Sequence, residues 1–437
     1  MAPRKLLFIT YEFPPFGGIP VQRVLNFSKY LPELGVEVHV LTARNAASPI
    51  RDESLLAQVP PAVRVHRAFT PEPPFHLRKR IWEMFFGGHA APDAPVPRAA
   101  GFQSWMKDLV RRPLLPDPQV LWKSFAVRAG ERVIRRYGID TVMATAPPFS
   151  VLLTGIELKR RCPHIRLVSD FRDEWLRFML TDFDFHSGDF ARRQAEAIER
   201  QTIEASDLVL AVTESSLNEI RSRYPGQPDR KWAMVPNGYD PQAVTAVPPP
   251  PRTPGRMIVG HMGTAYRTAS PRYYLDAVDR LPAAIRANIE TRFIGRIAET
   301  ERGVFDNRLS PVRLLGFQSQ QQALRLAAEC DYLLLTMIND FSLPGKLFEY
   351  LALGRPVLAL SPANGEVARL LAATRGGWCA PHDDGAAVER LLMSAWTRLQ
   401  DGAPPFAPDW NEIRRYERPR LAKWLYGELA ARLPEIG

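Results

Sequence analysis

The sequence contains few cysteines: Cys162, Cys330 and Cys379 are the three in 437 residues, and they lie far apart. This scatter excludes a disulfide framework and the paired spacings of structural zinc sites. No other metal-ligand spacing is evident, so we expect neither a metal nor an organic cofactor. Single scattered cysteines are typical of a reducing compartment, and we therefore expect a cytoplasmic protein.

Long apolar runs are also missing. No stretch approaches the 18 consecutive apolar residues that indicate a membrane-spanning helix. The apolar run in KLLFIT (residues 5–10) is too short for a signal peptide and predicts a first buried strand.

Acidic residues are outnumbered, since 57 Lys and Arg stand against 47 Asp and Glu, a formal net charge of +10. This balance favours acidic partners, namely nucleic acid, anionic lipid or phosphorylated small molecules. The sequence has neither a Cys/His finger nor the aromatic motif of RNA-recognition domains, so nucleic acid is not expected.

The chain alternates apolar, β-branched runs with amphipathic stretches, which indicates an α/β fold with parallel sheets. The expected strands are KLLFIT (5–10), EVHVLT (37–42), TVMAT (141–145), IRLVSDF (165–171) and LVLAV (208–212), then MIVGHM (257–262), TRFIG (291–295), VRLLGF (312–317), YLLLTM (332–337) and PVLAL (356–360). The proline-rich segment AVPPPPRTPG (246–255) separates the two groups and predicts a semi-rigid linker. Two doubly wound domains that face each other would place ligands at strand C-terminal ends, in the cleft between them.

We therefore place an N-terminal domain at 1–250 and a C-terminal domain at 251–405. Residues 70–118 break the alternation and form an insertion. The final segment, 406–437, is expected to be helical, with a kink or restart at Pro419.

SLPGKLFEYLALGRPVLAL (342–360) predicts a helix capped by Ser342, with Pro344 in its first turn and Gly354 at its end, followed by a strand. Lys346 and Glu349 share a face of this helix, one turn apart. One interpretation is a surface ion pair of small stabilising value. The other is a binding site, in which the helix amides and Lys346 hold an anion while Glu349 accepts hydrogen bonds from hydroxyls.

Five segments, in this order, resemble the retaining family 4 glycosyltransferases of the GT-B fold, which build bacterial surface polysaccharides. They are YEFPPFGGIPVQRVLNFSKYLPELGVEVHVLTA (11–43), ATAPPFSVLLTGIELKRRCPHIRLVSDFRDEW (144–175), EASDLVLAVTESS (204–216), VPNGYD (235–240) and the 342–360 segment. The resemblance implies two facing Rossmann-like domains, an acceptor-side N-terminal one and a donor-binding C-terminal one, with the last helix returning to the first domain. It also implies a hexosyltransferase that uses a nucleotide-sugar donor and a lipid-linked or polysaccharide-precursor acceptor.

The resemblance assigns the donor site. Gly263, Thr264 and Arg267 would face the diphosphate, and Arg267 with Lys346 would neutralise it as it leaves. The loop with Gly316, Phe317 and Gln318 would lie by the nucleobase, although it also suits an ordinary strand-to-helix turn. The donor helix would be entered through Leu343, Pro344 and Gly345, and Glu349 would bind the ribose. The family's first glutamate, eight positions before Glu349, is replaced by Phe341.

Two further sites lie in the first domain. Gly17 and Gly18 follow the first strand, where the absence of side chains lets the backbone approach a phosphate or sugar. SDFRDEW ends a buried strand with Asp170, Arg172 and Asp173. We expect Asp173 on the acceptor side as a catalytic residue, and Asp170 in a structural Asp–Arg network, with Arg172 as its nearest candidate.

The insertion suggests a membrane contact. FHLRKRIWEMFF (75–86) places Leu77, Ile81 and Phe85 on one stripe beside basic residues, as in an interfacial helix on anionic lipid. Residues 75–115 hold seven Lys and Arg against three acids, a net charge of +4. Peripheral binding to the inner face of the cell membrane is one expectation, and packing onto the N-terminal domain as an ordinary subdomain is the other.

Two other functions stay open at this point. One is a GT-B-like nucleotide-sugar epimerase or phosphorylase, for which no acid/base or pyridoxal signal is evident. The other is a non-catalytic subunit that binds nucleotide sugars, which Phe341 in place of a glutamate leaves open. Donor hydrolysis or transfer in vitro distinguishes an enzyme from a binding subunit.

Overall fold

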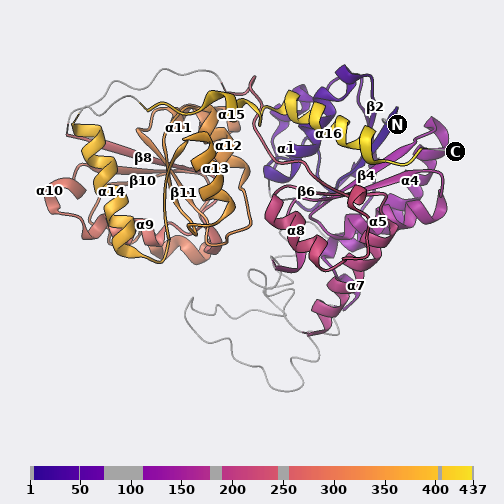
Figure 1. Ribbon diagram of the computed structural model, residues 1–437, viewed down its shortest axis with the longest axis horizontal. Coiled ribbons are helices and arrows are strands. Elements are labelled where there is room, and N and C mark those ends of the chain that lie inside the picture. Colours follow the sequence, from indigo (N-terminus) through magenta and orange to yellow (C-terminus); the bar gives the residue numbers. More distant parts are fainter. Residues whose placement is uncertain are drawn as a thin grey trace. The chain divides into compact units, whose positions relative to one another are not determined.

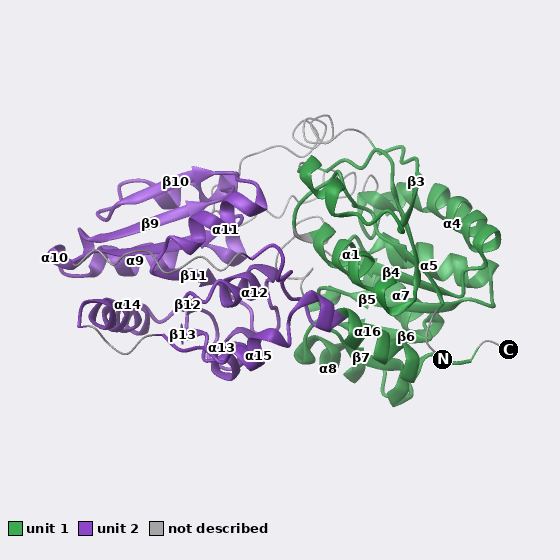
Figure 2. Ribbon diagram, turned by 90° about the horizontal axis from the view of Figure 1, so that it is seen from above, with its two compact units in different colours: residues 1–235, 422–437 green, residues 236–421 purple. Residues whose placement is uncertain are grey.

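The structure is a computed structural model that describes residues 4–48, 50–72, 112–177, 189–244, 255–401 and 406–435. The chain divides into two compact units, shown in Figure 2: unit 1 holds Met1–Val235 and Ala422–Gly437, and unit 2 holds Pro236–Leu421. The first boundary lies between Val235 and Pro236. This is upstream of the boundary predicted from the sequence, which lies within the proline-rich segment 246–255. The second boundary lies within the last helix, and not at residue 406.

Unit 1 is built on a parallel sheet of seven strands in the order β3-β2-β1-β4-β5-β6-β7. The strands are β1 (Lys5–Ile9), β2 (Glu37–Ala43), β3 (Arg64–Ala68), β4 (Thr141–Ala146), β5 (Arg166–Phe171), β6 (Leu208–Ala211) and β7 (Trp232–Met234). The central strands β1, β4, β5 and β6 are almost wholly buried, which explains why they read as continuous apolar runs.

The helices of unit 1 lie on both faces of its sheet, as Figure 1 shows. They are α1 (Ile19–Tyr30), α4 (Lys123–Tyr137), α5 (Ser150–Arg161), α7 (Asp189–Ala205), α8 (Glu214–Ser222) and α16 (Arg418–Arg432), of which α16 begins in unit 2. Helix α1 connects β1 to β2, toward one edge of the sheet, whereas α4 and α5 lead to β4 and β5, toward the other edge. Because such crossovers are right-handed, α1 lies on one face of the sheet and α4 and α5 lie on the other. The last helical segment restarts at Arg418, one residue before Pro419, as expected.

Unit 2 contains a second parallel sheet, of six strands in the order β10-β9-β8-β11-β12-β13. The strands are β8 (Met257–Met262), β9 (Ile289–Ile294), β10 (Val312–Gly316), β11 (Tyr332–Thr336), β12 (Val357–Leu360) and β13 (Gly377–Ala380). The helices are α9 (Arg272–Arg280), α10 (Ala283–Arg286), α11 (Gln320–Ala328), α12 (Gly345–Ala352), α13 (Glu366–Thr374), α14 (Gly385–Gln400) and α15 (Trp410–Arg414).

Two apolar layers enclose the sheet of unit 2. Leu333 and Leu335 of β11 pack with α11, α12 and α13 on one face, whereas Tyr332 and Leu334 pack with α9 and α14 on the other. This alternation is the period-2 pattern of a strand buried on both faces. The two sheets confirm the α/β, doubly wound fold that the sequence predicts.

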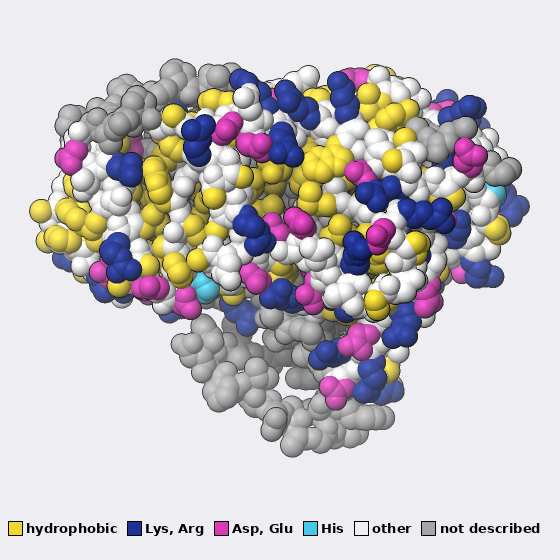
Figure 3. Space-filling model, in the orientation of Figure 1, with side chains coloured by type: hydrophobic (Ala, Val, Ile, Leu, Met, Phe, Trp, Pro, Cys, Tyr) yellow, Lys and Arg dark blue, Asp and Glu magenta, His cyan; other side chains and the backbone are white. Residues whose placement is uncertain are grey.

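Charge is distributed over both units. On the face drawn in Figure 3, Lys and Arg side chains stand among acidic and apolar ones. Within the described ranges, no helix is both long and apolar enough to cross a membrane. Residues 75–111, on which most of the predicted membrane contact depends, lie outside the described part of the chain.

Candidate functional site

The candidate site of unit 2 is formed where neighbouring parallel strands end at one edge of the sheet. The loop after β8 is held to the end of β9, because the Gly263 amide donates to the Ile294 carbonyl (2.8 Å). Gly263 has φ +107°, a conformation suited to glycine, and a Cβ on Gly295 would approach the Gly263 carbonyl oxygen to 2.2 Å. Both glycines are therefore needed for the close approach of these two backbones.

Helix α12 enters the same edge. Its N-cap is Pro344, without a side-chain cap, and Gly345 is its first residue. The prediction that Ser342 caps the helix is wrong: the Ser342 amide instead donates to Asn339 Oδ1 (2.9 Å) in the preceding loop. Leu343 packs, partly buried, against the apolar cluster below α12. The first amides of the helix thus receive no side-chain partner from the loop.

Lys346 is the central residue of the site. Its side chain is only 9% exposed, and its Nζ lies 2.8 Å from Nε2 of the fully buried His261 at the end of β8. The lysine also lies along Gly263, since a Cβ there would be 3.6 Å from Lys346 Cδ. Among the described residues it forms no ion pair, and burial lowers its pKa to about 7. Burial, and then the adjacent ammonium, lowers the pKa of His261 well below its usual range.

Glu349 has a separate environment, although it lies one turn after Lys346. Its Oε1 accepts a hydrogen bond from Gln320 Nε2 at the start of α11 (2.7 Å). Burial raises its pKa, while the bond from Gln320 and the charge of Arg418 act in the opposite direction. The ion-pair interpretation of Lys346 and Glu349 is therefore wrong, because each side chain has its own partner. Their order along the helix instead gives the site a cationic end and a hydrogen-bond-accepting end.

A buried tyrosine fixes α12 against β8. The Met262 amide donates to Tyr350 Oη (2.6 Å), and the Tyr350 ring is fully buried in the cluster beneath the helix. This bond joins the end of the strand that carries His261 to the helix that carries Lys346. The separation of the two side chains is thereby set by packed elements rather than by a loop.

The remaining predicted residues of unit 2 lie in loops at this edge. Thr264 and Arg267 are exposed, with Arg267 at the start of a 3₁₀ turn (Arg267–Ala269). Phe317 is 52% exposed, and the guanidinium of Arg296 lies 5.2 Å from its ring centroid.

Gly316 adopts φ +67°, and the side-chain Nε2 of Gln318 donates to the Leu315 carbonyl (2.7 Å). The glutamine that reaches Glu349 is Gln320, which the sequence analysis missed. Phe341, at the position of the family's first glutamate, is buried.

In unit 1, Gly17 and Gly18 follow β1 and lead into α1. The Gly17 amide donates to the Ile50 carbonyl (3.1 Å), and a Cβ on Gly17 would lie 2.9 Å from Asp52 Cβ. Gly18 is the N-cap of α1 with φ +92°. The two glycines thus serve a tight turn and a close approach to the neighbouring loop.

The carboxylate of Asp170 belongs to a buried network, but its arginine partner is Arg23 of α1. Arg23 Nη2 donates to Oδ1 of Asp170 (2.8 Å), whereas Arg23 Nε (2.8 Å) and Thr145 Oγ1 (2.7 Å) both donate to Oδ2. The expected pairing of Asp170 with Arg172 is therefore wrong. Arg172 instead donates to backbone carbonyls, among them those of Ala146 (3.2 Å) and Pro20 (2.6 Å).

Asp173 follows these residues and is partly exposed. Burial raises its pKa, and the charge of Arg172 acts in the opposite direction. Its carboxylate is thus a proton acceptor of increased basicity at the C-terminal edge of the unit 1 sheet.

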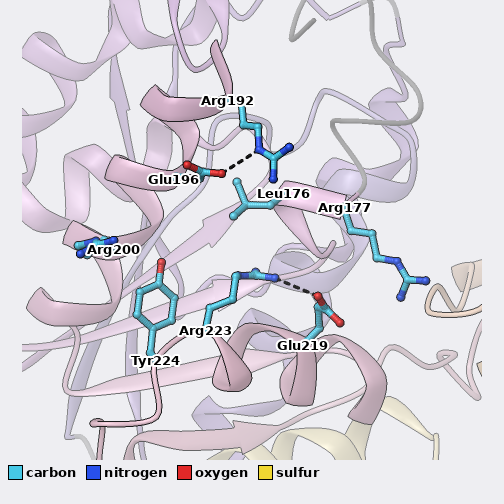
Figure 4. Close-up of a pocket in the computed structure, with 8 residues that line it drawn as sticks. All are labelled: Leu176, Arg177, Arg192, Glu196, Arg200, Glu219, Arg223 and Tyr224. Atoms are coloured by element: carbon cyan, nitrogen blue, oxygen red, sulfur yellow. Dashed lines mark hydrogen bonds and ion pairs between the residues drawn. The ribbon is translucent and has the colours of Figure 1, made fainter. Parts of the chain in front are cut away.

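Unit 1 also contains a cavity of about 420 Å³ between α7 and α8, shown in Figure 4. Its lining combines four arginines with two glutamates: Arg177, Arg192, Arg200, Arg223, Glu196 and Glu219. Arg223 is bound by the buried carboxylates of Glu174 (2.5 Å) and Glu199 (2.9 Å), so the charge of this arginine is balanced within the protein. None of the predicted site residues lines this cavity. Within the described ranges, no cluster of three or more His, Cys, Asp or Glu side chains is arranged to hold a metal ion.

Comparison with known proteins gives two family matches. The model described as Glycosyltransferase Family 4 matches residues 84–243, and the model described as Glycosyl transferases group 1 matches residues 256–395. A search of curated proteins found no match.

Many solved structures align with this chain, among them those of three proteins that cover nearly all of it. The lipopolysaccharide outer core galactosyltransferase WaaB in its apo form has 15% identity and a TM-score of 0.60 over 98% of this chain and 100% of that one. Anabaena Alr3699/HepE in complex with UDP and glucose has 14% identity and a TM-score of 0.59, with the same coverage. WaaG, a glycosyltransferase involved in lipopolysaccharide biosynthesis, has 13% identity and a TM-score of 0.59, again with that coverage. At these identities the structures show a shared fold.

Proposed function

The chain belongs to the family 4 glycosyltransferases of the GT-B fold, and we propose that it transfers a hexose from a nucleotide-sugar donor to a hydroxyl acceptor with retention of anomeric configuration. In this reaction the bond from the sugar C1 to the diphosphate breaks, and a bond from C1 to the acceptor oxygen forms. The hydroxyl proton is released, and negative charge collects on the leaving nucleoside diphosphate. A site for this chemistry needs cations and preorganised donors at the diphosphate.

Lys346 is the observation that carries the proposal. A lysine that is 9% exposed and has no acidic partner in the described part of the chain is costly unless an anion arrives to pair with it. It lies at the start of α12, whose first amides have no side-chain cap, and beside the backbone of Gly263. An uncapped helix start and a buried cation at one point suit a diphosphate.

The other residues receive roles by their position. Arg267 supplies the second cation and Thr264 a hydroxyl, both from the loop after β8. Glu349, beyond Lys346 on α12, accepts hydrogen bonds from the ribose hydroxyls. Phe317 and Gln318 lie at the nucleobase end. UDP is the first nucleotide to test, because the Anabaena HepE structure holds UDP and glucose.

The acceptor is assigned to unit 1. Asp173 would orient the acceptor hydroxyl. The backbone at Gly17 and Gly18, also in unit 1, would approach the phosphate or sugar of the donor. A lipid-linked or polysaccharide-precursor acceptor is supported by the likeness to WaaB, a lipopolysaccharide outer core galactosyltransferase, and to WaaG, a glycosyltransferase involved in lipopolysaccharide biosynthesis. Action at the inner face of the cell membrane follows from such an acceptor. Co-sedimentation with anionic vesicles tests it, and exchange of Arg78, Lys79 and Arg80 for Glu should abolish binding.

The reaction is tested by transfer and hydrolysis assays with UDP-hexoses. Lys346→Ala and Arg267→Ala should each lower kcat/KM more than tenfold, because each removes a cation from the leaving diphosphate. Arg325→Ala, which removes an exposed arginine on α11 of the same unit, should leave kcat/KM unchanged. Near-wild-type kcat/KM in both site variants contradicts the assignment. Nucleotide binding without transfer or hydrolysis, over a panel of donors and acceptors, indicates a non-catalytic binding subunit instead.

A further inference from the structure

We infer that His261 is a positioning residue: its neutral ring accepts a hydrogen bond from the ammonium of Lys346 and directs the ammonium past Gly263. The bound diphosphate then supplies the counter-charge that the described residues do not, and donor binding takes up a proton. The inference rests on the proposed function, in that the anion is taken to be the donor's diphosphate. It adds a role for a histidine to which the sequence analysis assigns none.

While Lys346 is protonated, its hydrogen bond fixes the tautomer of His261. A protonated lysine can only donate, so Nε2, which lies 2.8 Å from Nζ, is the acceptor. The ring proton of the neutral imidazole must then reside on Nδ1. Nδ1 is buried and has no hydrogen-bond partner within the described residues. A buried ring that accepts on one side and has no acid on the other stays neutral.

The surroundings keep other charges away from the pair. The ring of Phe293 on β9 lies 5.4 Å from the His261 ring, and Gly263 borders the lysine stem. Tyr350 of α12 bonds to the Met262 backbone.

The charged groups on adjoining elements have partners of their own. Arg292 of β9 pairs with Glu290 (2.6 Å), Glu349 accepts from Gln320, and Arg296 lies over Phe317. Lys346 therefore has a neutral acceptor where a structural lysine would have a carboxylate.

A neutral acceptor suits a phosphate site better than a carboxylate does. A carboxylate would pair with the lysine permanently and would repel the incoming diphosphate. A neutral imidazole restrains the direction of Nζ and leaves its positive charge unmatched. When the diphosphate arrives, the opposite charge favours the ammonium form. Because burial lowers the pKa of Lys346 to about 7 in the empty site, lysines that are neutral above this pH must gain a proton on binding.

The first test is calorimetry of UDP binding to the full-length protein, with GDP and ADP alongside, at pH 6.5 to 9. Two buffers with different ionisation enthalpies separate proton uptake from intrinsic heat. Wild type should take up close to one proton at pH 8 to 9, and its affinity should fall as pH rises. Lys346→Met should show only the proton exchange of the nucleotide itself.

Two variants of His261 separate positioning from packing. His261→Gln keeps an acceptor near the position of Nε2, whereas His261→Leu keeps volume and removes the acceptor. The leucine variant should bind UDP about tenfold or more weakly, and its affinity should fall at a lower pH, because nothing then stabilises the ammonium. The glutamine variant should restore the pH profile to within half a unit of wild type. Equal pH profiles for both variants and wild type overturn the positioning role.

A measurement without ligand keeps the two proposals distinguishable. The ¹⁵N imidazole shifts of His261, assigned by loss of its signals in His261→Gln, should report a neutral ring protonated on Nδ1 at pH 6, where Lys346 is mostly protonated. A ring protonated on Nε2 at this pH overturns the inference even if UDP binds. Conversely, if the ring shows the expected tautomer but the protein binds no nucleoside diphosphate, the donor assignment is wrong. The inference of proton uptake is then wrong as well. UDP binding without proton uptake leaves the donor site intact and overturns the inference.

Discussion

At the scale of single residues, the site depends on groups that are costly to bury. Lys346 has a pKa near 7 and Glu349 a raised pKa, and burial is the main cause in both. Perturbed groups of opposite charge type, one turn apart on one helix, are typical of functional sites. A structural role would more simply have paired the two with each other.

The free energy of unfolding should depend on pH because Lys346 is buried. Between pH 7 and pH 9 the unfolded chain keeps Lys346 protonated, whereas the folded protein releases this proton, so stability rises with pH. Relative to Lys346→Met, wild type should therefore gain about 2 kcal/mol over this range. Denaturant unfolding of both proteins at several pH values measures the difference. A difference that does not change with pH would show that Lys346 has an ordinary pKa.

Glu349→Gln should weaken UDP binding about tenfold with little change in melting temperature, because a carboxylate accepts hydroxyl hydrogen bonds more strongly than an amide does. The sharper readout is the preference for UDP over 2′-deoxy-UDP, which the variant should lose. Gln320→Ala, which removes the neighbour of Glu349 and keeps the carboxylate, is the control and should retain the preference. Unchanged affinity in Glu349→Gln would exclude a ribose contact.

At the scale of elements, the order of the parallel strands brings the proposed donor-site residues to one edge of the unit 2 sheet. Three loops lie at this edge: the loop after β8, the loop after β10 and the loop before α12. These loops and the start of α12 contain the residues of unit 2 that the sequence predicts for the donor site. The bond between Met262 and Tyr350 connects the end of β8 to α12. Helix α16 is shared between the two units of the chain: its residues from Ala422 onward belong to unit 1, whereas its first turn belongs to unit 2.

Leu429 on α16 tests this assignment. Its side chain is fully buried, so Leu429→Ala should lower the free energy of unfolding of unit 1 by about 2 to 5 kcal/mol. Lys423→Ala, at an exposed position of the same helix, should change it by less than about 0.5 kcal/mol. Denaturant unfolding measures both, and equal effects of the two variants would contradict the packing of α16 on unit 1.

At the scale of the whole molecule, two units with separate cores should respond separately to a ligand. The proposed donor residues Gly263, Arg267, Lys346 and Glu349 all lie in unit 2. A ligand that binds one folded unit stabilises that unit by mass action. The molecule should therefore not unfold as a single two-state system.

Scanning calorimetry with and without saturating UDP checks this expectation. One of two transitions should rise in temperature with UDP, and Lys346→Met should reduce that rise. The other transition should be the one that Leu429→Ala lowers. A single transition that both changes move would mean that the two units unfold cooperatively.

The sequence by itself determined the fold class and most of the sheet. All ten expected strands are present. Most of them are buried parallel strands, whose continuous apolar runs are recognisable from the sequence alone, whereas β10 is a largely exposed edge strand. The sequence analysis missed β3, β7 and β13, which lie at sheet edges, where strands are short or carry charged and half-exposed residues such as Arg64 and Arg67 of β3. Local composition does not reveal pairing with a neighbour that is distant along the chain.

The sequence also located the helix with Lys346 and Glu349, because i and i+3 positions share a face in any helix. Only the tertiary structure decided what those side chains meet. His261 lies 85 residues before Lys346, and Arg23 lies 147 residues before Asp170. Such pairs arise from the order of strands in a sheet, which no local pattern encodes. The sequence therefore specified which residues carry charge, and the packing of distant elements decided which of those charges are paired within the described part of the protein and which, like that of Lys346, are not.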